Sequence, residues 1–251
     1  MSESIPLASP VDITHYRDVA RNRVMTVGVE LEGGWDILPK GCSPPIRDGS
    51  VHVEGVYIGE YPSPVLNFDP ENKLYWKKWV TKMYPQHLNQ TCGMHVHMSF
   101  RTALTYQRLM SPTYPATIVA YVKKWALSKS IFESITADHC IWERLTGNSV
   151  FCQHIFHADE QVRSTGKDYD QHRVGHRYTV INYCWRNSTL ECRLLPMMPN
   201  VNIAMKAIQE IIDITNGYLV ATKAREKTVS TGLEYDPGLV VKEEDIVRVR
   251  V

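Results

Sequence analysis

The sequence predicts an α+β domain with a curved, mostly antiparallel sheet of about six strands. Several segments alternate apolar and polar residues with a period of two, which is typical of strands with one buried face. Other segments repeat apolar residues every three to four positions, which is typical of helices that would cover the apolar face of the sheet. Short connections between consecutive strands favour antiparallel pairing.

The length and composition are ordinary for one globular domain, which we assign to residues 1–251. The chain has 251 residues, of which 43% are hydrophobic and 22% are charged, and its net charge is +1. This balance gives no electrostatic case for a nucleic-acid or membrane partner. No apolar run approaches the roughly 20 residues that span a bilayer, and the first residues lack the pattern of a signal peptide. Six cysteines without a C-x-x-C pair predict free thiols in a reducing compartment, which we expect to be the cytoplasm.

The first third of the chain predicts a polar lead followed by two strands. Residues 1–22 form the lead. Residues 24–32 alternate apolar residues with glutamates and predict a strand that the pair Gly33-Gly34 ends. Residues 51–61 predict a second strand, bent near Gly55, which Pro62 and Pro64 terminate.

The middle of the chain predicts two helices around a third strand. Asp69-Pro70 is a typical helix start, and the helix is expected to reach about Tyr84. Residues 94–100 alternate again and place His95, His97 and Ser99 on one face. Residues 115–136 carry an apolar stripe of helical period. We expect four aromatic residues at helical spacing to pack in the core: Trp76, Trp79, Tyr121 and Trp125.

The last part of the chain predicts a loop, a hairpin and a long helix. Residues 138–157 are ambiguous, and the polar segment 158–177 predicts a mobile loop that is either solvated or a lid over the acceptor substrate. Residues 178–185 and 189–195 predict two strands joined by a turn at Asn187-Ser188. Residues 200–223 predict a helix capped by Asn200 or Asn202. The remaining residues mix turns with a short strand.

One face of the predicted sheet collects acids, histidines and an arginine: Glu30, Glu32, His95, His97, Glu191 and Arg193. Neighbouring carboxylates on one strand face repel each other, and a bound cation relieves that repulsion. Glutamates with an imidazole suit Mg²⁺ or Mn²⁺, and an arginine fork suits phosphate oxygens. Metals and an arginine beside a sheet would make a site for phosphoryl transfer. Each short motif is also common on solvated surfaces, and the shared strand face and chain order leave a metal or phosphate site and a solvated face equally open.

These motifs resemble those of the amidoligase family, in the carboxylate–amine ligase superfamily that also holds glutamine synthetase and glutamate–cysteine ligase. Taken in chain order, the matching residues are Glu30 and Glu32, Asp48 and Ser50, Glu60, His95 and His97 with Ser99, Arg177-Tyr178 with Asn182, and Glu191 with Arg193. The resemblance implies a catalytic domain similar to that of glutamine synthetase. It covers about two-thirds of the chain and includes no separate β-grasp domain and no ammonia-gating loop.

The resemblance also implies roles for single residues. Glu30, His95 and Glu191 would hold a metal that bridges the nucleotide phosphates, and Glu32 and Glu60 would hold a second metal near the substrate. The residues implied in nucleotide binding are His97, Ser99, Asn182 and Arg193, and those implied in catalysis are Arg193, Glu60 and Arg177. Arg193 would contact the transferred phosphoryl group, whereas Arg177 and Asn182 would bind phosphate or a substrate carboxylate.

The implied activity is ATP- and Mg²⁺- or Mn²⁺-dependent ligation of a carboxylate to an amine through an acyl phosphate. The substrates would be small molecules or peptides, and the amine an amino acid, polyamine, peptide or modified base rather than ammonia. The chain has no P-loop pattern, so ATP would bind through the metals on the sheet. A homo-oligomer is compatible with this interpretation.

Several alternatives stay open from the sequence. The fold could serve a phosphotransferase, a metal-dependent hydrolase, or a non-catalytic binding or structural module. A zinc site could draw on His139, Cys140, Cys152, His154 and His157, but their spacing fits no standard zinc pattern and favours core or loop thiols. Polar residues in or beside the long loop could bind the acceptor: Asp168, Asp170, His172, Arg173, His176 and Arg177.

Overall fold

The computed structural model describes residues 5–16, 26–67, 69, 71–100, 105, 108–128, 139–156, 178–184 and 189–231. Their strands are β1 (Ile5–Pro6), β2 (Thr26–Trp35), β3 (Tyr57–Pro62), β4 (Gly93–Ser99), β5 (Ile155–Phe156), β6 (Ile181–Cys184) and β7 (Thr189–Pro196). Their helices are α1 (Lys73–Met83), α3 (Thr113–Ser128), α4 (His139–Thr146) and α6 (Val201–Thr231). The predicted loop 158–177, the turn at Asn187-Ser188 and the predicted terminal strand lie outside the described residues, as do parts of the polar lead.

The main sheet is open and fully antiparallel in its described part, with the strand order β3-β2-β4-β7-β6. This confirms the predicted α+β class and antiparallel pairing. The described part of this sheet has five strands, where about six were predicted. The two further strands, β1 and β5, pair with each other in a separate two-stranded sheet.

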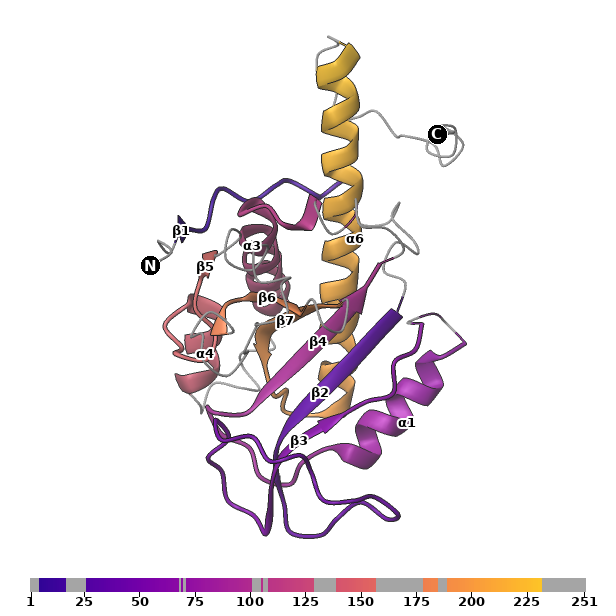
Figure 1. The fold of residues 1–251 in the computed structure, drawn as a ribbon, viewed down its shortest axis with the longest axis vertical. Coiled ribbons are helices and arrows are strands. Elements are labelled where there is room, and N and C mark those ends of the chain that lie inside the picture. The colour runs from indigo at the N-terminus through magenta and orange to yellow at the C-terminus, as the bar shows by residue number, and fades with distance from the viewer. Residues whose placement is uncertain are drawn as a thin grey trace, which may run out of the picture.

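One face of the sheet is apolar and is covered by helices. Cross-strand register aligns Val27 with Met98 and Leu190, and every one of these side chains is fully buried. The Thr215 hydroxyl of α6 lies 3.6 Å from the Met98 sulfur, which places α6 on this face. Figure 1 shows α6 passing behind the sheet, with α1 beside it. Burial of this apolar face is the main source of folding free energy. The opposite face of the sheet is polar and carries the candidate site.

The glycine pair in β2 does not end the strand as predicted. β2 continues through Gly33 and Gly34 to Trp35 and pairs with β3 along its whole end. A Cβ on Gly33 would lie 2.4 Å from the Pro85 Cβ, and one on Gly34 would lie 1.8 Å from the Glu54 carbonyl oxygen. These glycines therefore permit close chain approach within a strand and do not mark a turn.

Local backbone chemistry explains where β3 and the first helix begin. β3 begins only at Tyr57, after Gly55, whose φ of 128° favours glycine. Residues 51–56, which were predicted to belong to this strand, therefore lie outside it. The first helix runs from Lys73, and Asp69 caps the turn before it as predicted, because its Oδ1 accepts the Asn72 N–H at 2.8 Å. Pro70 lies outside the described residues.

The long final helix confirms one of the two predicted caps. The Asn200 side-chain oxygen accepts the Ile203 N–H at 3.0 Å, as an N-cap residue does. The helix then continues to Thr231, beyond the predicted end at residue 223. The ambiguous segment 138–157 contains α4 and β5. The four predicted core aromatics are buried or pack against the core. Among the described helices, none has the length and apolar character needed to cross a bilayer.

Candidate metal centre

The polar face of the sheet is assembled by cross-strand register. Glu30 on β2 lies opposite His95 on β4, and His97 on β4 lies opposite Glu191 on β7. At the other side of β2, Glu32 lies opposite Glu60 on β3. Directly opposed residues on one face are close enough for their side chains to meet. The face predicted from alternation alone is therefore confirmed in geometry.

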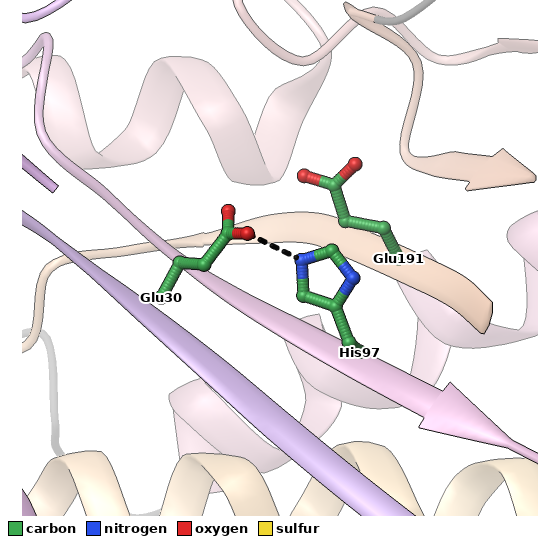
Figure 2. Close-up of side chains that lie close together, drawn as sticks. All are labelled: Glu30, His97 and Glu191. Carbon is green, nitrogen blue, oxygen red and sulfur yellow. Dashed lines mark ion pairs between the residues drawn. The ribbon is translucent and has the colours of Figure 1, made fainter. Parts of the chain in front are cut away.

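Glu30, His97 and Glu191 form what we call the histidine cluster. One ligand atom from each lies within 4.8 Å of the other two, a spacing that could hold a metal ion. Figure 2 shows the three side chains converging from β2, β4 and β7, with His97 Nε2 3.1 Å from Glu30 Oε1. The imidazole and two carboxylates suit Mn²⁺ or Mg²⁺.

Glu32, Asp48 and Glu60 form a second group, which we call the carboxylate cluster. Their ligand atoms also lie within 4.8 Å of one another. Asp48 comes from the loop before β3, and its Oδ1 accepts the Ser50 N–H and hydroxyl, both at 2.7 Å. The sequence supplied Asp48 only as part of a family motif, without a metal-binding role. Its side chain completes a three-carboxylate group that could hold a second cation.

His95 lies between the two clusters and is almost fully buried. Its Nδ1 is 3.3 Å from Glu30 Oε2 and 3.2 Å from Glu191 Oε1. Its Nε2 is 3.5 Å from Glu32 Oε1, and neither of these last two atoms has a hydrogen-bond partner among the described residues. Buried polar atoms without partners are costly. A cation bound by these residues would satisfy them, so the side chains present fit a divalent metal.

The electrostatics of the two clusters differ. Burial alone would raise the pKa of Glu30, but hydrogen bonds from His95 and His97 hold it well below its ordinary value. Burial would also raise the pKa of Glu191, and there Arg193 and the two histidines lower it. In the carboxylate cluster, burial and the charges of neighbouring acids, Glu30 and Asp48 foremost, raise the pKa of Glu60 to about 8. The largest influences on the Glu60 carboxyl all raise its pKa.

Arg193 lies beside the histidine cluster. Its guanidinium pairs with the Glu191 carboxylate and stands over the Tyr178 ring, 5.6 Å from the centroid. A β-bulge places Arg193 and Leu194 opposite the single residue His95. Burial would lower the pKa of Arg193, but the surrounding carboxylates, Glu191 first, raise it above its ordinary value. The guanidinium therefore stays charged at the edge of the cluster.

The remaining predicted site residues have different placements. Asn182 on β6 donates from Nδ2 to Glu191 Oε2 at 2.7 Å, so it belongs to the histidine cluster. Ser99 lies two residues beyond His97, where its hydroxyl and that of Thr26 hydrogen bond. Arg177 lies outside the described residues.

The zinc alternative gains no support from the part of the chain that the structure describes. Cys152 is fully buried, and burial raises the pKa of its thiol to about 11. A ring nitrogen of His154 bonds to the Arg144 carbonyl at 3.0 Å. Neither residue belongs to a described group that could hold a metal ion. The side chains of His139 and Cys140, together with His157, lie outside the described part.

Sequence reasoning missed Arg144. It lies in the segment that was ambiguous from periodicity, and its guanidinium is almost fully buried at 3.7 Å from the Glu32 carboxylate. A single arginine in an irregular segment carries no pattern, so only the fold could bring it to the site.

No family model, curated protein or solved structure matches this chain.

Proposed function

We propose that this protein is an ATP-dependent carboxylate–amine ligase of the amidoligase type that uses Mg²⁺ or Mn²⁺. The observation that carries the proposal is the pair of clusters on one sheet face, with Arg193 at their edge. Two adjacent cation sites beside a buried guanidinium are the parts that phosphoryl transfer requires, because its catalysis is mainly positioning and charge neutralisation. The motif resemblance supports the choice of ligase within that reaction class.

In this proposal, some of the side chains would bind the nucleotide and its metals, and others would bind the substrate. The histidine cluster, with His95, would hold one divalent cation, and the carboxylate cluster would hold the second. Bound cations would neutralise the phosphate charge of ATP. Arg193 would contact the transferred phosphoryl group through its planar fork. Ser99 and Asn182 would contact the nucleotide side, and Arg177 the substrate carboxylate or phosphate. His97, which the resemblance implies in nucleotide binding, belongs to the histidine cluster and would hold its cation.

The chemistry needs an activated carboxylate, because a free carboxylate is a poor electrophile. Transfer of the terminal phosphoryl group of ATP to a carboxylate oxygen forms an acyl phosphate and ADP. An amine then attacks the acyl carbon, phosphate leaves, and the amine gives up a proton as the amide forms. The cysteines whose side chains the structure describes are free thiols, which supports a reducing compartment such as the cytoplasm. They are Cys42, Cys92, Cys152 and Cys192.

The test is a mass-spectrometric screen of purified protein with ATP, Mn²⁺ and mixed amines and carboxylates. A ligase yields a condensation product and ADP only when both substrates are present. A phosphotransferase yields a stable phosphorylated product without the amine, and a hydrolase yields phosphate without a carboxylate acceptor. Glu30→Gln is the matched control, because it removes one ligand oxygen charge and keeps the side-chain shape. ATP left unconsumed in every mixture would contradict the proposal.

A further inference from the structure

Arg144 reaches the candidate metal centre from outside the sheet. It projects from α4, which packs against β7, and only 1% of its surface is exposed. Its Nη1 donates to the Arg193 carbonyl at 3.3 Å, and its Nη2 donates to the Thr91 carbonyl at 3.1 Å. These bonds fix the guanidinium between the chain just before β4 and the middle of β7.

The same guanidinium faces one oxygen of Glu32. Nη2 of Arg144 lies 3.7 Å from Glu32 Oε2, and this oxygen also accepts the backbone N–H of Gly93. The other oxygen, Oε1, lies 3.5 Å from His95 Nε2 and has no hydrogen-bond partner among the described residues. One side of the Glu32 carboxylate is thus anchored, and the other side is presented to the centre.

Gly93 makes this approach sterically feasible. A Cβ at residue 93 would lie 2.3 Å from Arg144 Nη1 and 2.7 Å from His95 Nε2, well inside contact distance. Both neighbours are almost fully buried, so neither could move aside without repacking. The glycine before the two histidines therefore leaves room for the Arg144 guanidinium beside His95 and Glu32.

We propose that Arg144 is a positioning residue of the metal centre: it anchors Oε2 of Glu32, so that Oε1 is held in place to bind the cation. The inference rests on the proposed function in one respect, that this centre binds a divalent cation. A purely structural arginine would hold α4 against the strand carbonyls and would have no coupling to Glu32. The two roles differ in whether the effect of losing Arg144 depends on the Glu32 carboxylate.

A double-mutant cycle separates these roles, with Mn²⁺ affinity and the Mn²⁺ electron paramagnetic resonance spectrum as readouts. Partners that orient a metal ligand typically contribute 10–100-fold to affinity. Arg144→Met should weaken Mn²⁺ binding by about 10–100-fold in the wild-type background and by less than about threefold beside Glu32→Gln. Arg144→Lys should recover part of the loss, because an ammonium can still reach Glu32. Gly93→Ala should weaken binding as Arg144→Met does.

The matched control is Val80→Ala on α1, a fully buried site in the core. It should lower the melting temperature and leave Mn²⁺ affinity unchanged. An equal loss from Arg144→Met with and without Glu32→Gln, or no loss at all, would overturn the inference. If Arg144→Met does not fold, Arg144→Lys is compared in the same two backgrounds with the same criterion. Failure of the wild-type protein to bind Mn²⁺ would instead overturn the proposed function, on which the inference depends.

Discussion

Both clusters on the polar face bring buried carboxyl groups close together, but the pKa values of these groups shift in opposite directions. In the histidine cluster, His97, His95 and Arg193 surround Glu30 and Glu191, and the pKa values of both carboxyls are lowered. In the carboxylate cluster, neighbouring acids surround Glu60, and its pKa rises to about 8. In the first cluster, hydrogen bonds and the positive charge of Arg193 stabilise the ionised carboxylates. In the second cluster, burial and neighbouring acids favour the protonated form of Glu60.

This difference shows which part of the site depends on an external cation. The two carboxyls of the histidine cluster stay ionised near neutral pH in the metal-free protein, because their pKa values are lowered. Burial would lower the pKa of His97, but Glu30 and Glu191 raise it, so His97 gives up a proton when it binds a metal. The carboxylate cluster must lose a proton before it can bind metal fully, so metal binding there competes with protons. The comparison predicts different responses of the two clusters to mutation, metal and pH.

The largest effect is expected for Arg193→Lys, beside the histidine cluster. Lysine keeps the charge but loses the planar fork that matches a phosphoryl group. Arginines in this role contribute about 10³–10⁵ in rate, so turnover of the ligase reaction should fall at least ~10²-fold, with a smaller change in nucleotide affinity. Steady-state kinetics with the substrates found by the screen would measure both.

Glu191→Gln is the control for this prediction. It removes a metal-ligand charge, so higher metal concentration should restore part of its activity, whereas the Arg193→Lys defect should persist. Equal responses of both variants to metal, or near-normal turnover of Arg193→Lys, would mean that Arg193 is only the partner of Glu191.

Metal should raise the melting temperature of the wild-type protein. A cation present at 100 times its dissociation constant stabilises the folded state by about 2.7 kcal/mol, or ~5–10 °C for a chain of this size. The increase should be larger near neutral pH than near pH 5, because protons compete with the metal at the carboxylates. Differential scanning fluorimetry with Mn²⁺ and Mg²⁺ measures it, and no shift at millimolar metal would count against both clusters.

The metal-free protein should become less stable as pH rises from about 4.5 to 8. The pKa of Glu60 rises from 4.5 in the unfolded chain to about 8 in the folded protein. Between these values the folded state holds a proton that the unfolded chain has released, so stability falls with increasing pH. Glu60 is partly solvated, so we count only about one pKa unit of this shift toward stability. The melting temperature should then fall by ~3–6 °C between pH 4.5 and 8.

Glu60→Gln isolates this effect. The variant should lack that part of the decline, so its melting temperature should change less between pH 4.5 and 8 than that of the wild type. The lowered pKa values of Glu30 and Glu191 act in the opposite direction: their contribution is complete above about pH 4.5 and is lost in acid. If the melting temperatures of wild type and Glu60→Gln change with pH in parallel, the pKa of Glu60 is not raised, and the two clusters do not differ as proposed.

The smallest effect is expected for Asp48→Asn. The amide oxygen can still accept both Ser50 bonds, while one charge of the carboxylate cluster disappears. Relief of repulsion should raise the metal-free melting temperature by ~2–4 °C, about 1 kcal/mol, and reduce the stabilisation by Mn²⁺. A lower metal-free melting temperature would show that Asp48 stabilises the loop more than it repels Glu60.

Local pattern predicted the strands well because alternation reports which side of a strand is buried. The residues of 26–32, 94–99 and 189–193 lie on the faces that their parity indicated, and the helices cover the apolar face. Pattern failed at Gly33-Gly34, where glycine is required by contacts with Pro85 and Glu54. Those contacts join residues distant in sequence, so no local rule contains them.

The sequence by itself determined the class of fold, the polar face and most acids and histidines of the candidate site, because side-chain alternation along a strand is a local property. Tertiary structure decided which of these residues meet, through register: it put both His95 and His97 against Glu30, and Glu60 against Glu32. It also brought in Asp48 and Arg144 from a loop and a helix. Their approach depends on chain packing over long sequence separations, which periodicity does not encode.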